Sequence, residues 1–314
     1  MPRRASSRFR RDGLPAGSDE FHLPELPVGR WGGFVFINPT RTRRCSRTGI
    51  AELAEHFSIW KFEDRYVEVH VAKVIAANWK VTQEAFCEAY HVAGTHPQVM
   101  PYLADAITQV DCWGNISRAI TPAGLPSPLL AWDPTEEDMF RAMFDIREGE
   151  DLPVQIEPGE TMRSAGARMV RERWRPIVGD EIDQMSDAEA MDSIDYTIFP
   201  NFHPWGAFNR IAYRFRPNGD DHRSSIMEVM YLAPFSGERP PPAEVQHLGV
   251  DDSWTEAPQL GTLAKVFEQD TFNMAKVQRG LETTYKPGVT LGDYQESKIR
   301  WIHQLLDEWI GDDE

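Results

Sequence analysis

Two histidines and a carboxylate stand close together in EAFCEAYHVAGTHPQ, the stretch from Glu84 to Gln98. Imidazole is the commonest metal ligand among protein side chains, so His91 and His96 are candidate ligands. Glu88, three residues before His91, would share a helix face with it. These residue types could therefore do metal chemistry.

The elements around the pair decide whether both rings can meet. The pattern from Gln83 to His91 predicts a helix, and Gly94 and Pro97 predict that it ends or kinks. Such a break could bring His96 back toward the first imidazole. However, the chain has nine histidines, so a short spacing also arises by chance. On spacing alone, a metal site and a solvated polar helix end both remain open.

A third ligand is suggested by LAKVFEQDTFNMAKVQRGL, which starts at Leu263. Its apolar residues recur at helical spacing and form one stripe, namely Leu263, Val266, Phe267, Met274, Val277 and Leu281. Asp270 completes this stripe. A core-facing carboxylate needs a partner, either an arginine or a metal, because its desolvation is costly. Two histidines and one aspartate match the facial triad that holds Fe(II) and leaves positions open for O2 and substrate.

The surrounding elements predict an α+β fold with an antiparallel sheet. Strands are expected at Phe34–Ile37, as a buried strand, and over YVEVHVAKV, with one buried face. NRIAYRFRP and SIMEVMYL predict a hairpin with Asn218-Gly219 at its turn. Helices are expected at about 262–282 and 293–311. Segregated strands and helices, without βαβ alternation, favour this class.

Composition narrows the function classes. The chain has 314 residues, is 41% hydrophobic and carries a formal charge of −16, which argues against nucleic acid or anionic lipid as a partner. No apolar run is long enough to span a bilayer. Three cysteines without a CxxC argue against a disulfide scaffold and favour the cytoplasm. We expect a loose basic leader at 1–20, rather than a targeting peptide, and one catalytic domain at 21–314.

Three separate segments resemble the α subunit of the Rieske-type aromatic-ring-hydroxylating oxygenases. NWKVTQEAFCEAYHVAGTHPQ resembles their iron-binding segment, WGGFVFINP the strand that opens their catalytic domain, and QDTFNMAKVQRGL the late helix with the aspartate ligand. The resemblance implies a helix-grip, START-like fold and a mononuclear Fe(II) held by His91, His96 and Asp270. It also implies that Glu88 is the carboxylate bridging to the Rieske [2Fe-2S] cluster of a neighbouring subunit in a homotrimer.

One departure from the family pattern is large. The family's Rieske domain precedes this region and binds its cluster through Cys-x-His and Cys-x2-His, and neither pair occurs in this sequence. The residues after Arg10 resemble the connection that follows a Rieske domain. We therefore expect the [2Fe-2S] cluster to be missing or to be supplied by another chain.

The resemblance implies an oxygenase component that activates O2 to hydroxylate an aromatic or other small organic substrate, as in aromatic hydrocarbon catabolism. Electrons would come from Rieske, ferredoxin and reductase partners. Val92 and Val266 are candidate pocket walls, although core packing is the more common explanation for such residues. A non-catalytic helix-grip ligand-binding module is the main rival. A zinc hydrolase is weakened by the absence of His-Glu-x2-His.

Overall fold

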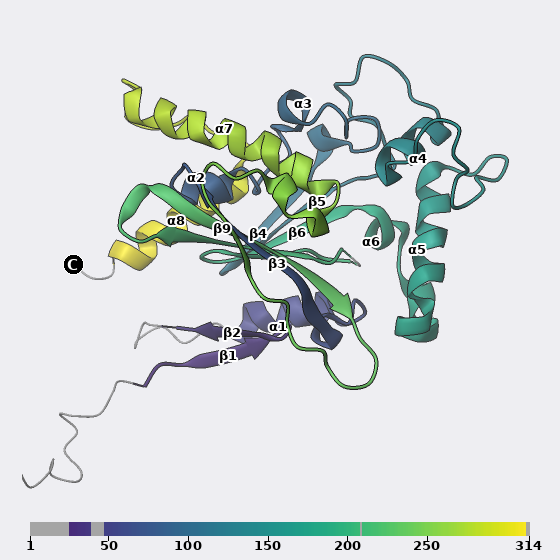
Figure 1. The fold of residues 1–314 in the computed structure, drawn as a ribbon, viewed down its shortest axis with the longest axis horizontal. Coiled ribbons are helices and arrows are strands. Elements are labelled where there is room, and N and C mark those ends of the chain that lie inside the picture. The colour runs from purple at the N-terminus through teal and green to yellow at the C-terminus, as the bar shows by residue number, and fades with distance from the viewer. Residues whose placement is uncertain (1–24, 39–46, 208, 312–314) are drawn as a thin grey trace, which may run out of the picture.

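A computed structural model describes residues 25–38, 47–207 and 209–311. Its centre is an eight-stranded sheet with the order β10-β3-β9-β8-β7-β6-β5-β4 (Figure 1). All neighbours are antiparallel except β10 and β3. The strands are β3 (Arg65–Ile75), β4 (Gln109–Trp113), β5 (Ile116–Thr121), β6 (Ser193–Ile198), β7 (Phe202–Pro204), β8 (Ile211–Asn218), β9 (Asp221–Pro234) and β10 (Gln246–Leu248).

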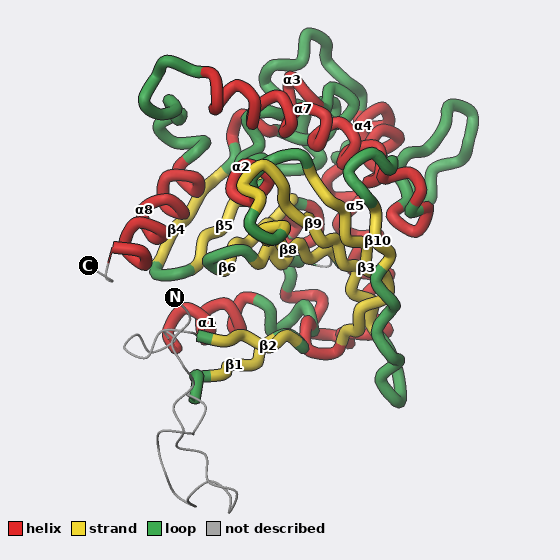
Figure 2. Tube along the Cα trace, turned by 60° about the vertical axis from the view of Figure 1, so that its left-hand side comes forward, coloured by secondary structure: helices red, strands yellow, loops and turns green. Residues whose placement is uncertain are grey.

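Helices cover both faces of this sheet (Figures 1 and 2). One face carries α2 (Trp79–Glu84), α3 (Val92–Thr95), α7 (Leu263–Thr283) and α8 (Ser297–Gly311). The other carries α1 (Arg47–His56) and the hairpin of β1 (Val28–Trp31) and β2 (Phe34–Ile37). Between β5 and β6 the chain forms α4 (Glu136–Phe144), α5 (Met162–Val178) and α6 (Asp187–Met191). Short 3-10 turns lie at Phe62–Asp64, Asp105–Ile107, Gly179–Gln184, Trp254–Glu256 and Pro258–Leu260.

The sheet is apolar on both faces, and each face supports its own core. On β8, Ile211, Tyr213 and Phe215 pack in the core beneath α7, whereas Ala212 faces the core on the α1 side. This alternation follows from the period of two along a strand. The expected α+β, helix-grip class is confirmed. Along the described part of the chain, no helix is both long and apolar enough to cross a bilayer.

Two strand predictions were wrong in detail. On β3 a register shift lies between Val67 and Val69, so Val67 packs in the α1-side core while Val69 and Val71 pack beneath α7. A bulge moves the following residues to the other face, and the strand has two buried faces rather than one. β2 is not a buried strand, because Val35 and Ile37 are about 60% exposed in a two-stranded hairpin with one free face.

The hairpin of β8 and β9 forms as expected, but its turn is shifted by one residue. Asn218 pairs with Asp221, so the two turn residues are Gly219 and Asp220 rather than Asn218 and Gly219. Gly219 has a φ of 60°, which suits glycine at the first position of a tight hairpin turn.

The predicted helix from Gln83 to His91 does not form. α2 ends at Glu84, irregular turns follow, and α3 begins only at Val92. No glycine or proline lies between the two helices. Instead Phe86 turns into the core, where its ring stacks on Phe215, with centroids 5.4 Å apart. Tertiary packing therefore outweighs local helix preference in this stretch.

The expected C-terminal helices form as α7 and α8. The buried line of α7 runs through Ala264, Phe267, Asp270, Met274 and Gln278. The predicted stripe was wrong at its end, because Val277 is 51% and Leu281 38% exposed. The stripe rotates gradually around a helix with 3.6 residues per turn, and the last turns of α7 leave the core. The predicted leader at 1–20 lies outside the described residues.

Candidate metal centre

The segment that carries both histidines is anchored at its start. Asn78 caps α2, because its Oδ1 accepts a hydrogen bond from the backbone N–H of Lys80 at 3.0 Å. The backbone N–H of Asn78 itself donates to Oε1 of Gln278 on α7, at 2.9 Å. α2 and α7 are therefore tied together beside the site, although they lie far apart in the sequence.

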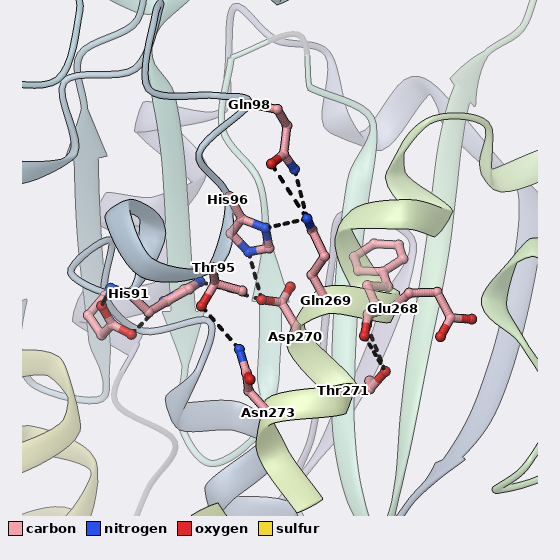
Figure 3. Close-up of polar contacts among 11 residues, drawn as sticks. His91, Thr95, His96, Gln98, Glu268, Gln269, Asp270, Thr271 and Asn273 are labelled. Atoms are coloured by element: carbon pink, nitrogen blue, oxygen red, sulfur yellow. Dashed lines mark hydrogen bonds and ion pairs between the residues drawn. The ribbon is translucent and has the colours of Figure 1, made fainter. Parts of the chain in front are cut away.

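The three candidate ligands converge from two segments. Nε2 of His96 lies 2.7 Å and Nε2 of His91 3.5 Å from Oδ1 of Asp270, and one potential ligand atom from each residue lies within 4.8 Å of the others. His96 and Asp270 are buried, while the His91 side chain is 28% exposed. Residues 85–98, which carry both histidines, are called the ligand loop below. Figure 3 shows His96 of this loop and Asp270 of α7 pointing at one another. Between the two histidines lies the single turn of α3, which ends at Thr95, so the helix end expected near Gly94 is present.

Each imidazole is oriented through its other nitrogen. Oε1 of Glu88 lies 2.6 Å from Nδ1 of His91, and Oε2 accepts from the His91 backbone N–H at 2.9 Å. Oε1 of Gln269 lies 2.8 Å from Nδ1 of His96, and Gln98 donates to the same oxygen (Figure 3). An acceptor at Nδ1 places the proton there and leaves Nε2 with its lone pair free to bind a metal.

The donor atoms fit a divalent metal. When Nδ1 carries the proton, Nε2 of His96 and Oδ1 of Asp270 are both electron-pair donors, so their approach to 2.7 Å needs a shared cation, either a proton or a metal ion. Burial lowers the pKa of His91, but hydrogen bonds to Asp270 and Glu88 outweigh this and raise it to about 10. Burial raises the pKa of Asp270, yet the two imidazoles lower it overall. The site is therefore built to hold positive charge.

A cavity of about 580 Å³ opens beside the three residues. The strands form its floor, with Ala119, Asp195, Trp205, Tyr213 and Tyr231 among the lining residues, and α7 and the ligand loop form its roof. Val92 and Val266, the two candidate pocket residues, both line it. A volume of this order suits a small organic ligand.

Sequence reasoning missed two ion pairs at the cavity wall. Lys298 of α8, which is fully buried, binds Oδ2 of Asp195 on β6. Arg163 of α5 binds both carboxylate oxygens of Asp192, just before β6. Near Asp195, the sequence hints at such a pair only through a carboxylate placed between apolar residues in SIDYTI. The partners Lys298 and Arg163 lie on distant helices.

The antiparallel sheet grips a long helix, and two histidines and an aspartate beside the cavity match the donor set of a facial triad. The family model described as "Ring hydroxylating alpha subunit (catalytic domain)" matches residues 57–312. The chain therefore belongs to the catalytic-domain family of the ring-hydroxylating oxygenase α subunits. The resemblance seen in three segments of the sequence is confirmed.

Known proteins similar to this chain include oxygenases that are named for different substrates. The glycine betaine monooxygenase oxygenase subunit of Pseudomonas aeruginosa is 24% identical over 143 residues, which is 43% of this chain and 32% of that protein. The chain thus matches about a third of the length of this curated relative.

Among solved structures, the quaternary ammonium Rieske monooxygenase CntA aligns with a TM-score of 0.52 at 15% identity, over 90% of this chain and 61% of that one. Naphthalene 1,2-dioxygenase from Rhodococcus sp. aligns with a TM-score of 0.50 at 15% identity, over 94% and 72% of the two chains. At these identities the structural matches establish the fold alone.

Proposed function

We propose that this chain is the catalytic part of an oxygenase that activates O2 at a mononuclear Fe(II) held by His91, His96 and Asp270, and that it hydroxylates an aromatic or other small organic molecule. The observation that carries the proposal is the convergence of these three side chains beside a cavity of about 580 Å³. Two imidazole nitrogens and one carboxylate oxygen occupy one face of a metal and leave the opposite face for O2 and substrate.

The chain's own residues supply positioning and protection. Bound Fe(II) would supply one-electron and O2 chemistry. Glu88 and Gln269 hold the Nδ1 protons of the two histidines and so keep both Nε2 atoms aimed at one point. The walls of the cavity at Val92, Val266 and Phe267 are apolar, which limits water around the reacting atoms and orients an organic substrate.

Electron entry is proposed at Glu88. Its carboxylate contacts the ring of His91, and its side chain retains 9% of its surface exposed. We propose that a [2Fe-2S] cluster on another chain or subunit faces this carboxylate, in a homotrimer supplied by ferredoxin and reductase partners. A similar solved structure, of a quaternary ammonium Rieske monooxygenase, is reported to reveal inter-subunit electron transfer.

Metal stoichiometry tests the ligand assignment. We expect about one Fe(II) per chain in the anaerobically loaded protein and almost none in Asp270→Ala, because the variant loses the single anionic ligand. Asn273→Ala is the matched control, since Asn273 lies on the same face of α7 and contacts the ligand loop only through Thr95. A colorimetric iron assay measures the iron content. One iron per chain in Asp270→Ala would show that the ligand assignment is wrong.

Turnover tests the function itself. The loaded protein is combined with O2, a Rieske donor and a reductase, and naphthalene and glycine betaine are offered as separate substrates. Product from either one supports the oxygenase, and Glu88→Gln is expected to keep its iron while losing at least tenfold in rate. Iron binding without any product, with these or with a wider substrate panel, would favour the ligand-binding module instead.

A further inference from the structure

We propose that Asp195 is a specificity-determining residue, which binds a hydroxyl or N–H donor of an uncharged substrate at the cavity wall. This inference deepens the proposed function, because it concerns the cavity next to the candidate metal centre. It rests on where the Asp195 carboxylate lies, on what neutralises it and on which lining groups are already engaged.

Asp195 presents its carboxylate to the cavity from the middle of the floor. It pairs with Ala119 on β5 and, through an isolated bridge, with Trp205 next to β7. Paired residues point to the same face of a sheet, and all three line the cavity. The two residues that flank Asp195 across the sheet are thus a small one, Ala119, and an aromatic one, Trp205.

The partner of Asp195 binds one of its two carboxylate oxygens. Lys298 reaches it from α8 and binds Oδ2. The lysine side chain is wholly buried, whereas the Asp195 side chain keeps 15% of its surface accessible. Since Asp195 lines the cavity and Lys298 does not, a ligand would meet the acceptor oxygens and not the ammonium. The pair therefore acts as a fixed hydrogen-bond acceptor with its charge neutralised from behind.

The other charged groups of the cavity wall are already satisfied. Asp192 accepts from the Ala123 backbone N–H at 3.0 Å and from both ends of the Arg163 guanidinium. Arg210, the lining arginine, pairs with Glu68 at 3.0 Å and lies over the Tyr231 ring, 4.6 Å from its centroid. Asp195 is thus the lining carboxylate outside the metal centre with capacity for one more donor.

Charge balance defines the class of ligand. A quaternary ammonium ion has no N–H to donate, and its positive charge is best stabilised by an uncompensated anion or an open aromatic cage. Asp195 is neutralised by the fully buried Lys298, and Asp192 by the partly buried Arg163. A neutral molecule with an apolar body and a hydroxyl or N–H group satisfies the acceptor without adding charge to a low-dielectric wall.

Binding of three matched probes tests the inference without any turnover. The probes are 2-naphthalenemethanol, its methyl ether and the corresponding trimethylammonium ion, which share one aromatic body. Calorimetric titration of the full chain is expected to show the alcohol binding at least about tenfold more tightly than the ether, because a hydrogen bond to a charged acceptor is lost in the ether. The cation is expected to bind more weakly than the alcohol.

Two variants distinguish recognition from mere structural support. Asp195→Leu combined with Lys298→Met removes the acceptor and leaves no unpaired buried charge; it is expected to bind alcohol and ether within about twofold of one another. Arg163→Met combined with Asp192→Asn removes the neighbouring ion pair in the same way and should keep the wild-type preference. If the first double variant does not fold, Asp195→Asn replaces it, with the preference expected to fall at least about threefold.

Several results would overturn the inference: equal affinity of the wild type for alcohol and ether, an unchanged preference without Asp195 and Lys298, tightest binding of the cation, or no binding of any probe at millimolar concentration. None of these depends on iron loading or electron supply. A failed oxygenase assay with a clear alcohol preference would instead count against the proposed function alone.

Discussion

At the scale of single residues, the histidines depend on the groups behind them. Gln269 accepts from Nδ1 of His96, and Gln98 in turn donates to Gln269. The two candidate ligands are therefore held by different groups, His91 by the carboxyl group of Glu88 and His96 by the amide of Gln269. The orientation of His96 therefore depends on the side-chain rotamer of Gln269.

Gln269→Ala should lower the affinity for Fe(II) about tenfold to a hundredfold, because the His96 ring loses the group that fixes its orientation. Gln98→Ala is the control, since Gln98 touches Gln269 but neither histidine. Co(II) stands in for Fe(II) in the measurement. Titration of each variant with Co(II), followed by its absorption spectrum, gives the two affinities. Equal affinities in Gln269→Ala and the wild type would mean that backbone packing alone positions His96.

At the scale of elements, β3, β8 and β9 are held together near their middle by charge. Glu228 on β9 is only 3% exposed and is contacted by His70, Arg214 and Arg216 from β3 and β8. Burial alone would raise the pKa of Glu228, but the neighbouring His70, the hydrogen bonds from Arg214 and the charges of Arg214 and Arg216 lower it to about 2. This carboxylate therefore stabilises the sheet while it is ionised.

The pH dependence follows from the direction of that shift. The folded-state pKa lies below the ordinary value of 4.5, so the stabilisation is full above about pH 5 and is lost as the pH falls toward 2. Glu228→Gln should lower the free energy of unfolding by about 1–3 kcal/mol at pH 7, and by less at pH 3. Urea unfolding at both pH values checks this. Glu68→Gln, which removes an exposed pair with Arg210, should cost under about 1 kcal/mol at either pH.

The turn of the β1–β2 hairpin packs closely against Phe62. Gly32 has a φ of 61°, and a Cβ there would lie 2.3 Å from the Phe62 ring. Gly32→Ala should therefore destabilise the protein by about 2–4 kcal/mol, through both backbone strain and overpacking. Gly29→Ala, in the same hairpin, has no atom within 4 Å of the added carbon and should cost under about 1 kcal/mol. Equal denaturation midpoints for the two variants would contradict this account.

At the scale of the whole molecule, features set by neighbouring residues could be predicted from the sequence better than features set by contacts between distant residues. The period of α7 placed Asp270 on the buried face, because helix periodicity is a property of neighbouring residues. The alternation of β8 gave its two faces for the same reason. The break between α2 and α3 could not be predicted, since Phe86 is drawn into a core built from β8 and α7.

The residues of the candidate site also differ in whether the sequence predicts them. His91, His96 and Asp270 are recognisable from residue type, spacing and the family resemblance. The pairing of Asp195 with Lys298 joins residues 103 positions apart and leaves no periodic trace in the sequence. The roles of Glu88, Val92 and Val266 stay predictions, although the structure places all three at the cavity.

The contact between His96 and Asp270 closes a loop of 174 residues. Neither segment alone offers more than two candidate ligands, so a growing chain has no complete site until the ribosome has released α7 and the sheet has formed beneath it. The proposed metal site would therefore be completed only after the sheet and α7 have come together. A nascent or partly unfolded chain would hold no three-ligand iron site, and redox-active metal would be bound only where a finished cavity already encloses it.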